Sequence, residues 1–219
     1  MMGIKNQKGI SLPIIIVAIV TVIAIGGGIF VFIGSNRGDD TTTSSTTGTT
    51  NDSKKPAFAP KGTAGVSYVA KLSGTASDTT LAANIEYDGE GNSHYVGTAP
   101  ESVEMYKIGS EYIICTNATC IATTTTSSPT GSEQSTYSEE DVASWKNSAI
   151  YKGKQSCPAG SCDAWQVTQD SYTGTIYVAR DGRVSRTIWK SDNSNMTIDL
   201  EYKDITITRP ENVQTIPGM

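Results

Sequence analysis

The feature that most constrains this chain is an uncharged apolar run near its amino terminus, from Ile10 to Ile33. These 24 residues are rich in Ile and Val. As a helix they would extend about 36 Å, enough to cross a hydrocarbon core of roughly 30 Å. A core helix of a soluble protein would carry a polar stripe, and this run has none. The run therefore predicts a transmembrane helix through which the protein contacts the membrane.

Two features argue against removal of this run as a signal peptide. The apolar region of a secretory signal is roughly 7–15 residues long and is followed by a small-x-small site. Here the run is longer, and Ile33-Gly34-Ser35 is a poor cleavage site. Lys5 and Lys8 precede the run and acidic residues follow it, which places residues 1–9 in the cytoplasm. We therefore expect a single-pass protein of the cell membrane with an extracytoplasmic domain.

The start of the run offers an alternative. The segment Lys8-Gly9-Ile10-Ser11-Leu12 resembles the start of type IV pilin helices, which are cut after the glycine, here Gly9. Those pilins usually carry Glu at the fifth mature position, which is Ile14 in this chain. On this alternative the protein would be a pilin-like or surface-display structural subunit.

Charge and composition separate the rest of the chain into two parts. The chain has 17 basic and 22 acidic residues; three basic residues and no acidic one lie within residues 1–37, so the remainder carries a net charge of −8. Phosphate backbones repel such a domain, so we expect no nucleic-acid partner. Residues 34–62 include TTTSSTTGTT and predict a disordered linker. The folded domain is expected at 63–219, with a second Thr/Ser-rich tract at 123–136 as an exposed loop.

Alternating apolar and polar residues predict a mainly β domain. The clearest case is Met196–Lys203, where strict alternation indicates a strand that covers a core with one face. Asp181-Gly182 predicts a two-residue hairpin that would place Tyr177 opposite Arg186. One helix is expected around Ser138–Asn147. Further strands are expected at 66–73, 83–87, 93–96, 102–108, 111–115, 175–180 and 183–189. The predicted class is mainly β (α+β), a curved antiparallel sheet with one or a few helices.

The carboxy-terminal part carries a second resemblance. Its segments are Tyr151-Lys-Gly-Lys, Cys162-x-x-Trp165-x-Val167, Ile176-Tyr-Val-x-x-Asp181-Gly182, Glu201-Tyr202-x-Asp204-Ile205 and Ile216-Pro217. This succession resembles lipoprotein-carrier domains of the LolA/LppX type, in which a half-barrel sheet wraps an apolar cavity that holds lipids. The resemblance implies a membrane-anchored binding domain for a lipid or another hydrophobic small molecule. The ligand-facing residues would be Trp165, Val167, Ile198, Leu200 and Tyr202.

The four cysteines form two closely spaced pairs, Cys115 with Cys120 and Cys157 with Cys162. An even number of cysteines in an exported domain predicts disulfides, and three connectivities are possible. The turn-like sequences TNAT and PAGS favour the two local pairs. A zinc site formed by all four thiolates is the alternative.

Other candidate sites are weak. His94 is the only histidine, no Gly-x-Ser-x-Gly motif accompanies it, and we expect it on an ordinary strand. Asp88–Asn92 begins like a calcium loop, but Ser93 and Ala99 occupy the positions of the required Gly and Glu, so a tight turn is favoured. Arg180, Arg183 and Arg186 could form an anion-binding edge or simply be solvated. We assign no catalytic residue, metal or cofactor and expect no enzyme, although an enzyme with a carboxylate pair stays open as an alternative.

Overall fold

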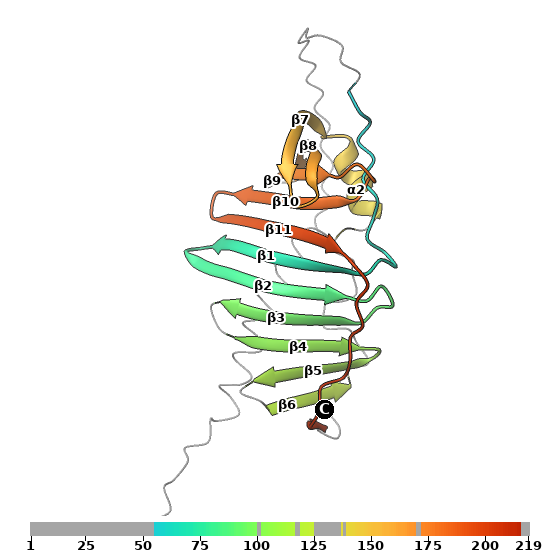
Figure 1. The fold of residues 1–219 in the computed structure, drawn as a ribbon. Coiled ribbons are helices and arrows are strands. Elements are labelled where there is room, and N and C mark those ends of the chain that lie inside the picture. Colours follow the sequence, from blue (N-terminus) through green and yellow to red (C-terminus); the bar gives the residue numbers. More distant parts are fainter. Residues whose placement is uncertain are drawn as a thin grey trace, which may run out of the picture. The chain divides into compact units, whose positions relative to one another are not determined.

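The computed structural model describes residues 55–99, 102–116, 119–124, 137, 139–169 and 172–215, all within one compact unit. These residues form one twelve-stranded sheet and one short helix, α2 (Figure 1). The predicted transmembrane run, the Gly9 site and most of the tract at 123–136 lie outside them. Within the described ranges, no helix has the length and apolar character that a membrane span requires.

The chain runs through the sheet as two antiparallel meanders. Strands β1 to β6 follow one another outward from the middle, and β7 to β11 return from the other edge until β11 pairs with β1. The short β12 extends the first edge as a parallel partner of β6. The elements are β1 (Tyr68–Ala76), β2 (Thr79–Tyr87), β3 (Ser93–Ala99), β4 (Val103–Ile108), β5 (Glu111–Thr116), β6 (Thr119–Thr124), α2 (Glu139–Lys146), β7 (Ile150–Cys157), β8 (Gly160–Gln169), β9 (Tyr172–Val178), β10 (Val184–Ser191), β11 (Ser194–Tyr202) and β12 (Val213–Thr215). The predicted mainly β sheet with one short helix is confirmed.

Helix α2 identifies one face of the sheet, called the helix face below. Trp145 of α2 is buried against Trp189 of β10, with ring centroids 5.6 Å apart. Tyr137 packs edge-on against Trp145, and its hydroxyl lies 2.7 Å from the Thr187 hydroxyl. Gly174 makes room for this group, because a Cβ there would lie 2.5 Å from the Trp189 ring. The aromatic core under α2 therefore depends on a glycine in the neighbouring strand.

The connection between β9 and β10 differs from the predicted two-residue turn. Val178 pairs with Val184, so residues 179–183 form the connection. A bulge then lies between Val184 and Arg186, after which Arg186 pairs with Tyr177, as predicted. The bulge takes up one residue, Ser185, whose buried hydroxyl accepts a hydrogen bond from the Ala159 amide at 3.1 Å. The turn prediction was wrong, although the register further along the hairpin is correct.

Residues 55–62 belong to the folded part, although their sequence suggested linker. Phe58 is buried, with its ring edge-on to Trp165 at 5.3 Å. The Lys61 amide donates to the Gly182 carbonyl at 2.9 Å. Lysine, proline, alanine and glycine make up the rest of this stretch, so its composition does not reveal that its one aromatic residue reaches the core.

Both disulfides join neighbouring strands and confirm the local pairs. Cys115 bonds to Cys120 across β5 and β6, and Cys157 bonds to Cys162 across β7 and β8. All four cysteines are consumed, so the zinc alternative is wrong. The pairing registers place both bonds on the face opposite α2, where each belongs to a small apolar cluster.

Candidate functional site

A ladder of apolar side chains crosses seven strands on the helix face. Residues paired across antiparallel strands lie on the same face, so the register alone assigns these side chains to one surface. In sheet order they are Leu200, Ala70, Ile85, Tyr95, Met105, Ile114 and Ile121. A continuous apolar band on one face of a sheet is a common feature of surfaces that bind another apolar group.

The ladder changes in exposure along its length. Leu200, Ala70 and Ile85 are buried, whereas Tyr95 and the members after it on β4 to β6 are only half-buried. Val103 of β4 is half-buried on the same face. Partial burial raises the pKa of the Tyr95 hydroxyl. We call the half-buried part the β3–β6 face; its members are Tyr95, Val103, Met105, Ile114 and Ile121.

Helix α2 does not cover the β3–β6 face. It packs against β8 and β10, in the other half of the sheet. Among the residues that the structure describes, no second helix lies over this face. The β3–β6 face is therefore the part of the helix face where the sheet offers partly exposed apolar side chains.

The residues predicted to face a ligand all lie on the helix face, but most of them are fully covered. The exposed fractions are 2% for Trp165, 0% for Val167, 5% for Ile198 and 3% for Leu200. Tyr202 is half-buried, and its hydroxyl donates to the Val184 carbonyl at 2.9 Å. These residues form the core between the sheet and its covering segments. The sequence analysis thus named residues of this face, but none of those that form the β3–β6 face.

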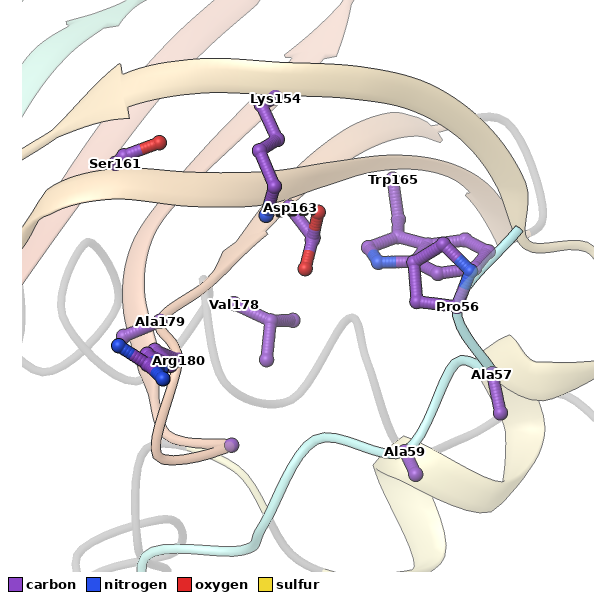
Figure 2. A pocket seen from close by; sticks show the side chains of 11 residues that line it. Pro56, Ala57, Ala59, Lys154, Ser161, Asp163, Trp165, Val178, Ala179 and Arg180 are labelled. Atoms are coloured by element: carbon purple, nitrogen blue, oxygen red, sulfur yellow. Dashed lines mark hydrogen bonds and ion pairs between the residues drawn. The ribbon is translucent and has the colours of Figure 1, made fainter. Parts of the chain in front are cut away.

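A cavity of about 500 Å³ lies at the other end of the sheet (Figure 2). It is bordered mainly by residues 56–59, strand β8 and the end of β9. Its lining comprises Pro56, Ala57, Ala59, Lys154, Ser161, Asp163, Trp165, Val178, Ala179, Arg180 and Gly182. Trp165 is the only one of the predicted ligand-facing residues that reaches this cavity.

The acidic residue of the cavity, Asp163, already has two side-chain partners. Asp163 accepts hydrogen bonds from the Lys154 ammonium at 3.0 Å and from the Tyr151 hydroxyl at 2.8 Å. Burial opposes ionisation of Asp163, but these two hydrogen bonds outweigh it and lower the pKa of the carboxyl. The Asp163 hydrogen bond is also the main cause of the raised pKa of Tyr151.

The face of the sheet opposite to α2 carries a cluster of polar side chains around the single histidine. His94 lies on β3 and stacks on Tyr106, with ring centroids 4.3 Å apart. Its Nδ1 is 3.0 Å from a Glu86 oxygen and its Nε2 is 2.9 Å from a Glu104 oxygen. The strand position agrees with the prediction, whereas the two carboxylate partners require a register that the sequence does not reveal. In the described part of the chain, no His, Cys, Asp or Glu group is arranged to hold a metal ion.

The Asp88–Asn92 segment forms the expected tight turn. One Asp88 oxygen accepts hydrogen bonds from the Glu90 amide at 2.7 Å and the Asn92 amide at 3.1 Å. The carboxylate is therefore used to close its own turn, as in an Asx-turn.

Comparisons with known proteins give only distant structural likenesses. No family model matches the chain, and no curated protein matches it. Among solved structures, LprF from Mycobacterium bovis has a TM-score of 0.45 at 12% identity, over 68% of this chain and 90% of that chain. The lipoprotein LppX from Mycobacterium tuberculosis has a TM-score of 0.42 at 9% identity, over 65% and 88%. An uncharacterized conserved protein from Thermus thermophilus has a TM-score of 0.42 at 9% identity, over 69% and 90%.

The weak resemblance to LppX that was expected from the sequence thus appears among the solved structures as well. A likeness at this level concerns the fold alone. No ligand or partner of this protein follows from it.

Proposed function

We propose that this protein is a non-enzymatic binding protein that holds a lipid or another hydrophobic molecule on the β3–β6 face. The observation that carries the proposal is the apolar ladder, which stays apolar over four strands where its side chains are only half-buried. Each methylene that moves from water onto such a surface contributes about 0.8 kcal/mol. An acyl chain along the ladder would therefore be held without a specific polar contact.

The proposed mechanism is passive. Apolar burial is non-directional, so the face would tolerate variation in chain length and saturation. With the predicted membrane helix at Ile10–Ile33, the domain would receive or hold its ligand close to the membrane surface. The pilin-like alternative depends on residues 8–14, which lie outside the described residues, and it stays a prediction.

Native mass spectrometry of the full chain, released from a mild detergent, tests this proposal. We expect a co-purifying adduct of lipid-like mass that is lost on unfolding. Met105→Asp places a charge on the ladder and should reduce adduct occupancy at least several-fold, because an unpaired charge cannot lie beneath an acyl chain.

Val96→Asp is the matched control, because the register assigns Val96 to the opposite face of β3. Circular dichroism checks that both variants fold. The absence of an adduct on the wild-type chain, under conditions in which a known lipid-binding protein keeps its lipid, would overturn the proposal. An equal loss of adduct occupancy in the two variants would overturn it as well.

A further inference from the structure

The cavity beside Trp165 has a local charge opposite to that of the chain. The whole chain carries a net charge of −5. Around the cavity, however, Lys154 and Arg180 belong to the lining, and the Lys55 ammonium lies 5.4 Å from the Trp165 ring centroid. The only acidic residue of the lining is Asp163. Cations therefore outnumber acids around this cavity, although the chain as a whole is acidic.

The acidic residues close to the cavity are already paired. Asp163 binds Lys154 and Tyr151, as described above. Asp181 accepts the Arg183 amide at 3.0 Å, and the Arg183 guanidinium lies 4.9 Å from the Tyr202 ring. Arg180, by contrast, is exposed and makes no ion pair or hydrogen bond with any residue that the structure describes.

Most of the remaining lining of the cavity is apolar, with Ser161 as the exception. Figure 2 shows Arg180 at one end and Trp165 with Pro56 at the other, with Val178 between them. Trp165 is held between Phe58 and Tyr151, with centroids 5.3 and 4.9 Å away. The turn that carries Arg180 is closed by the bond between the Gly182 amide and the Ala179 carbonyl at 2.9 Å. The exposed Arg180 side chain and the almost fully buried Trp165 ring thus lie at opposite ends of one space.

We propose that this cavity binds a small molecule that carries an oxyanion, a carboxylate or a phosphate, on a flat apolar body. The Arg180 guanidinium binds the oxyanion through a pair of parallel hydrogen bonds, which is the geometry that arginine offers to both groups. The apolar body lies against Val178 and Pro56, at the end of the cavity that Trp165 also lines. A volume of about 500 Å³ accommodates a molecule of two fused rings. The site is distinct from the β3–β6 face and does not depend on the function proposed for it.

Isothermal titration calorimetry of the full chain in a mild detergent tests the site with 2-naphthoate and 2-naphthyl phosphate as probes. Titration into detergent alone provides the blank. We expect saturable binding of at least one probe, and the tighter probe identifies the carboxylate or the phosphate as the preferred oxyanion. Neutral 2-naphthamide should bind about ten-fold more weakly, because it lacks the charge that Arg180 pairs with.

Arg180→Gln should weaken the tighter probe by about ten-fold as well. Lys190→Gln is the matched control: it removes the same charge from an exposed residue of β10 and should leave binding unchanged. Binding of neither probe to the wild-type chain would overturn the proposal. Equal binding by wild-type and Arg180→Gln, or equal binding of the amide and the anions, would overturn it as well.

Discussion

His94 links three neighbouring strands through its contacts with two carboxylates. Glu86 on β2 and Glu104 on β4 flank its ring, and Tyr106 lies beneath it. The hydrogen bond from the Tyr106 hydroxyl is the main cause of the lowered pKa of Glu104, with a further contribution from His94. Burial and this same contact raise the pKa of Tyr106 to about 12. The group thus stabilises the ionised form of a surface carboxylate.

This arrangement predicts an acid-sensitive contribution to stability. A carboxyl group whose pKa is lower in the folded state stabilises the fold when it is ionised, and it loses that contribution as the pH falls below the ordinary value of 4.5. Glu104→Gln cannot titrate, so its stability should depend less steeply on pH in this range. Urea unfolding between pH 7 and pH 3.5 measures the difference. Parallel pH profiles for the two proteins would show that Glu104 makes no such contribution.

The roles of several individual residues could not be predicted from the sequence. Cross-strand neighbours such as Glu86 and His94 become visible only when the register is known. Gly174 carries no local signal either, because its importance comes from the Trp189 ring on the next strand. By contrast, Asp88 satisfies its turn within five residues, and this feature could be predicted from its local sequence.

At the scale of elements, strands with clear alternation were predicted and weakly patterned ones were not. Strand β11 alternates strictly, and its buried residues are the predicted Met196, Ile198 and Leu200. Strand β6 reads TCIATT and β12 is only three residues long, so neither shows an alternation that distinguishes it from a loop. The bulge at Ser185 could not be predicted either, because the partner of the Ser185 hydroxyl is an amide in the distant β7–β8 turn.

The two disulfides each close a short hairpin, and their energetic contribution can be estimated. Cys115 and Cys120 are separated by five positions, as are Cys157 and Cys162. On the chain-entropy model a ring of this size lowers the stability of the unfolded state by about 2 kcal/mol. We expect Cys115→Ala with Cys120→Ala to reduce the free energy of unfolding by about that amount, as measured by chemical denaturation.

The double replacement of Cys157 and Cys162 by alanine serves as the comparison, because its ring is of equal length. Similar losses would agree with the entropic estimate. No loss in either double variant would contradict the assignment of these bonds as stabilising elements.

At the scale of the molecule, the sheet places apolar residues from distant parts of the chain on one surface. Leu200 and Ala70 are neighbours only because β11 pairs with β1. The order of the strands was not predictable from their patterns, and therefore neither was the position at which the apolar ladder becomes half-exposed. This is the physical reason why most of the residues named from the sequence lie in the core, and why the half-buried residues of the β3–β6 face could not be named.

Photo-crosslinking of the full chain with a diazirine-labelled phospholipid, followed by peptide mapping, shows directly whether the β3–β6 face holds a hydrophobic ligand. We predict that labelled peptides from the folded domain come from β3 to β6, residues 93–124, and that Met105→Asp reduces this labelling while Val96→Asp does not. Labelling confined to other strands, or equal labelling in both variants, would contradict the assignment of the β3–β6 face as the site of a hydrophobic ligand.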